Sequence, residues 1–188
     1  NTISNRQTSL AVVQNVTVAN NTFFNVTVPT ETLTITQDIT LTNSILIRNN
    51  TFLNTYIPIR TLGANLQNFT IVNNTVRNLT GFTQGGIALS PGLAGTGRNI
   101  FIENNSIESS QNTIRYTNVY VRNNTIIGEL FPFETSNLTI ENNTFNRGNI
   151  DIGAFGGDNF TIRNNYISNI GVEGIHLDDD TDIAVIAN

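Results

Sequence analysis

The stretch IENNTF, at residues 140–145, decides the fold because the chain contains the same pattern seven times. Each copy places two adjacent asparagines between apolar residues. The seven copies are VANNTF at 18–23, IRNNTF at 47–52, IVNNTV at 71–76, IENNSI at 102–107, VRNNTI at 121–126, IENNTF at 140–145 and IRNNYI at 162–167. The first asparagines of successive pairs stand 19–31 residues apart. Self-similarity at such a period is the signature of a repeat architecture.

Apolar residues recur at every second position before each asparagine pair. Leu138 and Ile140 alternate with polar residues. This period of two, with many β-branched residues, predicts a strand. If the alternation continues, Asn142 points inward, and so does Phe145 three residues later. One residue between them must then form a corner. We assign the corner to Asn143, because asparagine tolerates the left-handed backbone conformation better than most residues.

An inward asparagine in every repeat predicts a ladder of stacked side chains. Amides about 4.8 Å apart can donate to one another along the stack. A buried amide is costly unless it is paired, and a ladder pairs all but the ends. The predicted ladder consists of the first asparagine of each pair: Asn20, Asn49, Asn73, Asn104, Asn123, Asn142 and Asn164.

A third short strand follows in most repeats, at 87–89, 114–116, 150–152 and 175–177. Units of three strands stack as the coils of a parallel β-helix. A helical fold is excluded because no 3.6-residue period occurs and Asn, Thr and Gly are poor helix formers. We therefore predict an all-β chain, with one domain over residues 1–188. Its expected architecture is a single-stranded, right-handed parallel β-helix of about eight coils.

The NNT corners and their flanking apolar positions resemble the right-handed parallel β-helix superfamily, which has the pectate-lyase-like fold. The resemblance covers essentially the whole chain. It implies a right-handed path, as does the crossover rule for parallel strands. It leaves function open, since the superfamily includes polysaccharide lyases, glycoside hydrolases, phage tailspikes, adhesins and structural repeats.

An enzymatic alternative follows from the resemblance, because family enzymes act on acidic polysaccharides. They use paired carboxylates or a carboxylate-bound calcium on the third-strand face. The best match is GIHLDDDTD at 174–182, with the only histidine and the densest acids. Two carboxylates could act as acid and base, and three could hold calcium. The catalytic candidates are His176, Asp178, Asp179 and Asp180, and the calcium candidates are Asp178, Asp180 and Asp182. We favour a solvated acidic turn, without catalytic role or cofactor, and the paired-Asp and Gly-His-Gly signatures of the polygalacturonase-like hydrolases are missing from matching places.

The amino-acid composition limits the kinds of molecule that the chain is expected to bind. Only 12% of the 188 residues are charged, the net charge is −5, and the nine basic residues form no cluster. This charge pattern argues against nucleic acid and anionic membrane surfaces as partners, since both need a basic footprint. No apolar run approaches the roughly 20 residues of a membrane span. The absence of cysteine excludes disulfides and thiolate metal sites.

Charged residues occupy the position just before the asparagine pair in several repeats. Arg122 and Arg163 alternate there with Glu103 and Glu141. Stacking of the repeats predicts an exposed ladder in which Glu141 lies beside both arginines. Such exposed pairs stabilise by about 0–1 kcal/mol each.

Twelve asparagines head the N-x-Ser/Thr motif of N-glycosylation. Six of them belong to the predicted ladder, where an inward side chain leaves no room for a glycan. The other six lie at strand ends and are the predicted acceptors: Asn15, Asn25, Asn68, Asn78, Asn137 and Asn159. Their alternative role is that of turn residues, which asparagine favours in any case.

The two termini share one phase of the repeat. IAN at 186–188 followed by NTI at 1–3 recreates the pattern of VANNTF at 18–23. The chain also begins at Asn1 without methionine, which favours a processed, extracellular or cell-surface product. The expected assembly junction consists of Asn1, Thr2, Ile3, Ile186, Ala187 and Asn188.

We therefore expect a non-enzymatic structural protein whose subunits join head to tail, by strand continuation, into a filament or adhesive fibre. Its partner would be a second copy of itself, with N-linked glycans as a further expectation. The alternative is a carbohydrate-active or carbohydrate-binding β-helix domain.

Overall fold

The structure is a computed structural model. It describes residues 1–11, 14–26, 32–36, 41–62, 65–77, 86–90, 97–152, 158–171, 173–177 and 184–187. Within these ranges all regular elements are strands, and no helix occurs. The strands form two sheets, and every strand pair in both sheets is parallel.

The eight-stranded sheet collects the strands that lead into the asparagine pairs, together with β22. Its spatial order is β22-β19-β16-β14-β12-β9-β6-β3, so each repeat adds one strand beside that of the preceding repeat. The strands are β3 (Val16–Ala19), β6 (Leu41–Arg48), β9 (Asn65–Val72), β12 (Arg98–Glu103), β14 (Thr117–Arg122), β16 (Ser136–Glu141), β19 (Phe160–Arg163) and β22 (Ala184–Ala187).

The 14-stranded sheet contains two rows. The row that follows the asparagine pairs consists of β4 (Thr22–Phe24), β7 (Thr51–Leu53), β10 (Thr75–Arg77), β13 (Ser106–Ile114), β15 (Thr125–Pro132), β17 (Thr144–Asn146) and β20 (Tyr166–Ser168), preceded by β1 (Thr2–Ser4). The second row consists of β2 (Thr8–Ala11), β5 (Leu33–Thr36), β8 (Ile59–Leu62), β11 (Ile87–Ser90), β18 (Ile150–Ile152) and β21 (Ile175–Leu177). The long strands β13 and β15 run through both rows and join them into one sheet.

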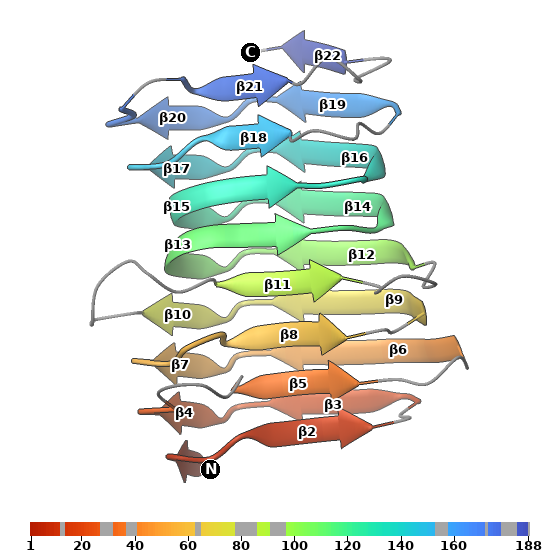
Figure 1. Ribbon diagram of the computed structural model, residues 1–188, viewed down its shortest axis with the longest axis vertical. Coiled ribbons are helices and arrows are strands. Elements are labelled where there is room, and N and C mark those ends of the chain that lie inside the picture. Colours follow the sequence, from red (N-terminus) through yellow and green to blue (C-terminus); the bar gives the residue numbers. More distant parts are fainter. Residues whose placement is uncertain are drawn as a thin grey trace.

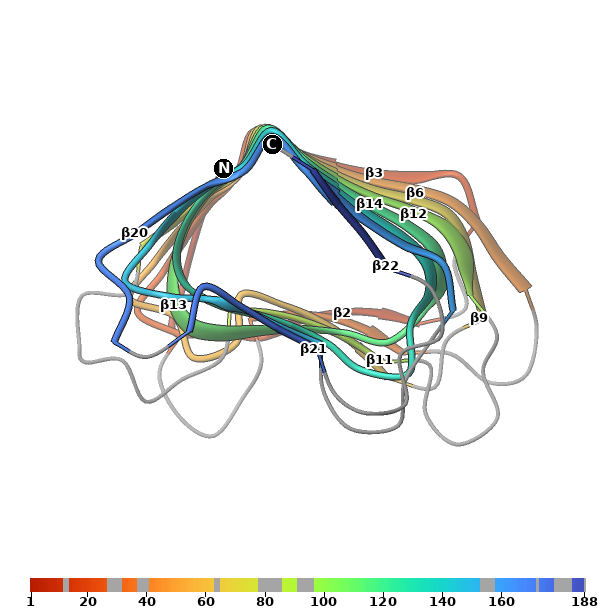
Figure 2. The same ribbon diagram turned by 90° about the horizontal axis from the view of Figure 1, so that it is seen from above.

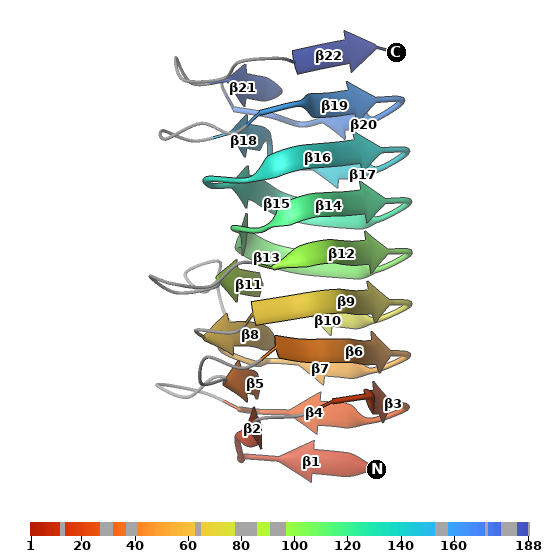
Figure 3. The same cartoon turned by 90° about the vertical axis from the view of Figure 1, so that its right-hand side faces the viewer.

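The strands stack along the long axis of the molecule, with β1 at one end and β22 at the other (Figures 1 and 3). Seen along this axis, the sheets enclose a common interior (Figure 2). The prediction of an all-β chain with parallel strands is confirmed, and the arrangement is consistent with a parallel β-helix-like fold. The expected third strands at 87–89, 150–152 and 175–177 are present as β11, β18 and β21.

The interior is filled by apolar columns that run from repeat to repeat. Val121 of β14 pairs in register with Ile102 of β12 and with Ile140 of β16, and all three are buried. Phe23 stacks on Phe52 with ring centroids 4.8 Å apart and planes 4° from parallel. Each apolar side chain is thus covered from above and below by a neighbour of similar shape, which removes its surface from water.

The corners of the chain are made mainly by asparagine in the left-handed conformation. In the described part of the chain, twenty residues other than glycine have positive φ, and all but Ser44, Glu134 and Arg147 are asparagines. The first asparagine of every pair belongs to this set, with φ between 54° and 58°. Asparagine pays less for this conformation than other residues with a Cβ atom. The left-handed conformation that the corners require therefore explains much of the abundance of asparagine.

The structure corrects the predicted ladder by one residue. The first asparagine of each pair is exposed, and the second turns inward. The residues predicted to form the ladder, and now placed outside, are Asn20, Asn49, Asn73, Asn104, Asn123, Asn142 and Asn164. The residues that form it are Asn21, Asn50, Asn74, Asn105, Asn124, Asn143 and Asn165.

The physical reason is the place of the left-handed residue. Asn142 itself has φ 56°, so the alternation of sides stops at Asn142 rather than at Asn143. Glu141 and Asn142 therefore both lie outside, and Asn143, only 1% exposed, starts a new alternation that brings Phe145 inward.

Each amide inside the ladder makes several hydrogen bonds. The carbonyl Oδ1 of Asn143 accepts from the backbone N–H of Asn124 at 2.9 Å and from Asn124 Nδ2 at 3.0 Å. Asn124 Nδ2 also donates to the backbone carbonyls of Ile102 and Arg122, at 2.8 and 3.0 Å. The ladder thus satisfies side-chain and backbone groups that would be costly to bury unpaired.

The predicted charge pairs are present on the outer face of the eight-stranded sheet, but Glu141 is buried at 9% exposure rather than exposed as expected. Arg122 Nε lies 2.8 Å from Glu141 Oε1, and Arg163 Nη2 lies 2.5 Å from Glu141 Oε2. Arg122 also approaches Glu103 at 4.0 Å and covers the ring of Tyr120 at 4.6 Å from its centroid. These contacts link β12, β14, β16 and β19 across the surface.

Candidate functional site

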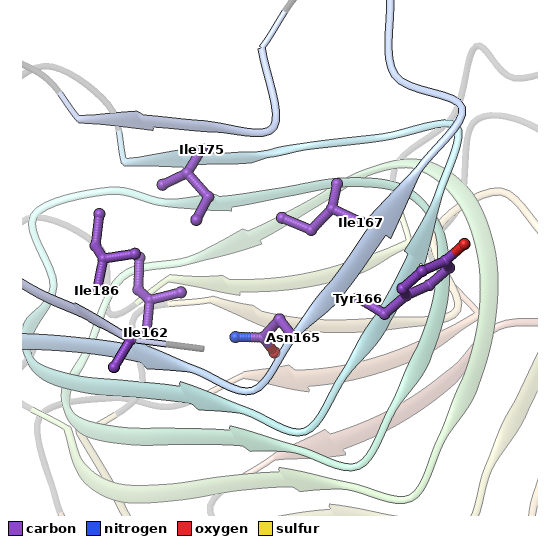
Figure 4. A pocket seen from close by; sticks show the side chains of 7 residues that line it. Ile162, Asn165, Tyr166, Ile167, Ile175 and Ile186 are labelled. Carbon is purple, nitrogen blue, oxygen red and sulfur yellow. The ribbon is translucent and has the colours of Figure 1, made fainter.

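The candidate site is the end surface of the stack formed by β19, β20, β21 and β22. A pocket of about 460 Å³ opens there between the two sheets (Figure 4). Its lining consists of Ile162, Asn165, Tyr166, Ile167, Ile175, Ile186 and Ala187. We call this surface the β22 face. Among the described residues, its lining contains no carboxylate, imidazole or guanidinium group, and it offers apolar contact and hydrogen bonding.

The apolar columns lose their cover at the β22 face. Ile186 pairs in register with Ile162, yet Ile186 is 54% exposed and Ile162 only 2%. Tyr166, which stands where most repeats carry threonine, is 66% exposed. The face therefore presents apolar surface of the same kind that a further repeat covers elsewhere in the stack.

The asparagine ladder ends at this face with unused donors. Asn165 Oδ1 accepts from Asn143, and Asn165 Nδ2 donates to the carbonyl of Ile140 at 2.9 Å. In the preceding repeats the backbone N–H and Nδ2 of the ladder asparagine also donate to the next Oδ1. Among the residues that the structure describes, none accepts from the backbone N–H of Asn165.

The sheet edge at β22 points its hydrogen-bonding groups outward at Ile186. The Ala187 carbonyl accepts from Asn164 N–H at 3.1 Å, so the groups of Ala187 point toward β19. Successive residues of a strand point these groups to opposite sides, so those of Ile186 point away from β19.

The opposite end of the stack, the β1 face, carries the matching groups. Asn1 occupies the ladder position, and its Nδ2 donates to Asn21 Oδ1 at 3.3 Å. Its amino group donates to the Asn20 carbonyl, also at 3.3 Å. Thr2 pairs with Thr22 and Ile3 with Phe23. No described residue donates to Asn1 Oδ1, so this face presents an acceptor where the β22 face presents donors.

The structure therefore separates the predicted junction residues into two groups at opposite ends of the stack. Asn1, Thr2 and Ile3 belong to the β1 face, and Ile186 and Ala187 belong to the β22 face (Figure 3). Asn188 lies outside the described residues. The sequence prediction did not include Asn165 at this end of the stack, because it placed the ladder on the first asparagine of each pair.

Of the catalytic candidates, the structure describes only His176, on β21. Its Nδ1 lies 3.0 Å from Asp151 Oδ1 on β18, on the exposed surface. Asp178, Asp179, Asp180 and Asp182 lie outside the described residues, and with them the calcium candidates. Asp151 was missed in the sequence, although alignment of IDI at 150–152 with IHL at 175–177 places it in the column of His176.

Over the described residues, no group of three or more His, Cys, Asp or Glu side chains is arranged to hold a metal ion. The same ranges contain no helix long and apolar enough to cross a membrane.

The predicted glycan acceptors Asn15, Asn68, Asn137 and Asn159 are exposed, and Asn25 is half-buried. Asn78 lies outside the described residues. The reason for excluding the first asparagine of each pair no longer holds, because these side chains are outside.

Comparisons with known proteins add no relative. No protein-family model matches the chain, and a search of curated proteins gave no match.

Proposed function

We propose that the chain is a structural, non-enzymatic right-handed parallel β-helix of about eight coils. Its copies join head to tail, the β1 face of one on the β22 face of the next, into an extracellular filament or adhesive fibre. The observation that supports this most is the match in phase and in hydrogen-bonding groups between the two faces. Handedness follows the crossover rule for parallel strands.

The strands of the two faces match in register. β1 and β20 belong to the same row, so Ile3 of one copy would continue the column of Ile167 in the other. β3 and β22 belong to the eight-stranded sheet, where Val18 would continue the column of Ile186. Each apolar column would then pass through the junction without a shift.

The asparagine ladder gives the proposed contact between copies a polarity. Asn165 would donate from its backbone N–H and Nδ2 to Asn1 Oδ1 of the next copy, as Asn143 donates to Asn165 at 2.9 and 3.0 Å. Two β1 faces would bring acceptors together, and two β22 faces would bring donors together. The contact is therefore heterologous, and heterologous contacts that do not close generate filaments. About eight coils at roughly 4.8 Å each give an axial repeat of about 40 Å.

Proline substitutions that block one face at a time test this proposal. Ile186→Pro removes the outward donor of β22. Thr2→Pro combined with Ser4→Pro does the same for β1, since the Asn1 carbonyl points toward β4 and the groups of Thr2 and Ser4 point away. We expect wild-type protein to form fibres in electron microscopy and each blocked variant to be monomeric by light scattering. An equimolar mixture of the two variants should form dimers only.

Two other outcomes would overturn the proposal in different ways. Wild-type protein that stays monomeric at high concentration rejects assembly and favours the carbohydrate-active or carbohydrate-binding alternative. A blocked variant that forms homodimers by itself shows a symmetric contact through the remaining face, and rejects head-to-tail polarity. Asn123→Gly, on the outer corner, serves as a control that should leave assembly unchanged.

A further inference from the structure

Four asparagine positions recur at the corners of the stack, and their side chains have different partners. The second asparagine of each pair forms the ladder, and inside the stack its amide is engaged from both sides. The corner that follows the short strand after the pair makes its own contacts from repeat to repeat, as from Asn54 Nδ2 to Asn25 Oδ1 at 2.7 Å. The two remaining positions are the first asparagine of each pair and the corner that precedes the eight-stranded sheet.

At the corner before the eight-stranded sheet, asparagine side chains of neighbouring repeats hydrogen-bond to one another. Asn99 Nδ2 donates to Asn68 Oδ1 at 3.1 Å, and Asn137 Nδ2 donates to Asn118 Oδ1 at 3.0 Å. Asn159 Nδ2 continues to Asn137 Oδ1 at 3.1 Å. A substituent on Nδ2 would replace one of the two amide hydrogens and compete with this pairing.

The first asparagine of each pair points its side chain outward. Its backbone N–H donates to the neighbouring strand, as from Asn123 to the Glu141 carbonyl at 3.2 Å. Within the described residues, its side chain makes no hydrogen bond. This corner is also where the repeats superimpose most closely along the axis (Figure 2). The result is a straight, exposed column of free carboxamides: Asn20, Asn49, Asn73, Asn104, Asn123, Asn142 and Asn164.

The corner conformation alone does not require asparagine at every position of this column. A left-handed corner accepts other residues, since Ser44 and Arg147 occupy such corners elsewhere, yet this column is asparagine in all seven repeats. Two residues later, six repeats carry Ser or Thr and the seventh carries Tyr166. Tyr166 still pairs in register with Thr144, so the strand itself does not need a hydroxyl.

We propose that this column is a modification site for N-linked oligosaccharide. The sites are the six members that head an N-x-Ser/Thr triplet: Asn20, Asn49, Asn73, Asn104, Asn123 and Asn142. A free, exposed carboxamide followed at the second position by a hydroxyl side chain is the acceptor that the modification requires. This assignment replaces the acceptors predicted from the sequence.

The reaction needs a membrane-bound transferase and a lipid-pyrophosphate-linked oligosaccharide as co-substrate. Asparagine Nδ2 forms a bond to C1 of the reducing-end sugar, the bond from C1 to the pyrophosphate oxygen breaks, and one amide proton passes to the released lipid pyrophosphate. Neighbouring acceptors stand only about 4.8 Å apart along the stack. A glycan on one repeat therefore obstructs the next, and we expect occupied repeats to alternate with free ones in any one molecule.

Secretion of the chain from yeast, followed by site-resolved glycopeptide mass spectrometry, tests the proposal. We expect glycans on the first asparagines of the pairs, with lower occupancy at Asn137 and Asn159. Glycans confined to Asn15, Asn68, Asn137 and Asn159, or found nowhere on the secreted chain, would overturn it.

Two variants sharpen the test without touching the asparagine. Thr125→Ala should abolish modification of Asn123 and leave Asn137 unchanged, and Thr139→Ala is the matched variant for Asn137. Tyr166→Thr completes the triplet at Asn164 and should add a glycan there. Absence of that glycan, with the other members of the column occupied, would contradict the proposal.

Discussion

At the scale of single residues, the structure gives two neighbouring asparagines opposite tasks. Asn123 forms the corner, with φ 56° and an exposed side chain. Asn124 is 2% exposed and hydrogen-bonds to the repeats on both sides. Asparagine suits both tasks for different reasons: it tolerates the left-handed conformation, and its amide both donates and accepts.

The same substitution at these two residues separates the two tasks. Asn124→Gly should lower the free energy of unfolding by about 1–3 kcal/mol more than Asn123→Gly, because it removes the Oδ1 acceptor that the buried backbone N–H and Nδ2 of Asn105 use. Glycine at residue 123 fits the positive φ without strain, and its cost in the unfolded chain is common to both variants. Urea unfolding followed by circular dichroism measures the difference. Equal losses would argue against the ladder.

Tyr116 makes stability depend on pH at the alkaline end. Burial raises the pKa of its hydroxyl above the ordinary value of 10.0, while its hydrogen bond with Thr61, 3.0 Å long, acts in the opposite direction. The folded chain therefore keeps a proton that the unfolded chain releases. This contribution is fully present below pH 10 and is lost as pH rises above it, by up to about 1.4 kcal/mol per pH unit. Tyr116→Phe should show a shallower loss of stability above pH 10 than wild-type protein in urea titrations. Identical slopes would refute the assignment.

At the scale of elements, the long strands β13 and β15 decide how the rows of the larger sheet connect. Their register shifts between Glu108 and Gln111, and Gly128 of β15 lies opposite this irregularity. Gly128 has φ 126°, and a Cβ atom there would stand 1.7 Å from the Ser109 carbonyl oxygen. Only glycine accepts both the conformation and the close approach of the backbone.

Gly128→Ala should therefore lower the free energy of unfolding by more than about 2 kcal/mol, through backbone strain and steric overlap. Gly171→Ala is the matched control, because a Cβ atom at Gly171 would meet no atom within 4 Å. We expect the control to change stability by less than about 0.5 kcal/mol. Thermal melting of both variants is the measurement, and a tolerated alanine at residue 128 would contradict the observed strand path.

At the scale of the whole molecule, the described parts of the two faces present mainly apolar and amide groups, with the Asn1 ammonium as a charged group at the β1 face, and ion pairs lie on the outer surface of the sheets. The ion pairs around Glu141 lie on that outer surface, away from the pocket at the β22 face. Assembly through the faces would therefore depend on sheet hydrogen bonds and buried apolar surface rather than on salt bridges.

The proposed filament should consequently survive salt. In about 1 M sodium chloride the Debye length is about 3 Å, so exposed charge pairs are largely screened, whereas apolar burial is not. Sedimentation at low and high salt should recover the same fraction of assembled protein. Dispersal of the fibres by salt would indicate an electrostatic junction.

The sequence by itself determined the repeat, its strands and its apolar columns, because each of these depends on a local period of two and on columns that recur with the asparagine pair. It also determined the charge ladder, which depends only on the order of the repeats.

Only the tertiary structure decided which asparagine of each pair turns inward. A single left-handed residue reverses the alternation, and both asparagines suit that conformation equally well in the sequence. Contacts between repeats that are 19–31 residues apart in the chain decide three features. They place Asn143 inside, leave donors at Asn165 and put Asn142 in the outer column. Local pattern cannot distinguish these alternatives, since their energies differ only when the repeats are stacked.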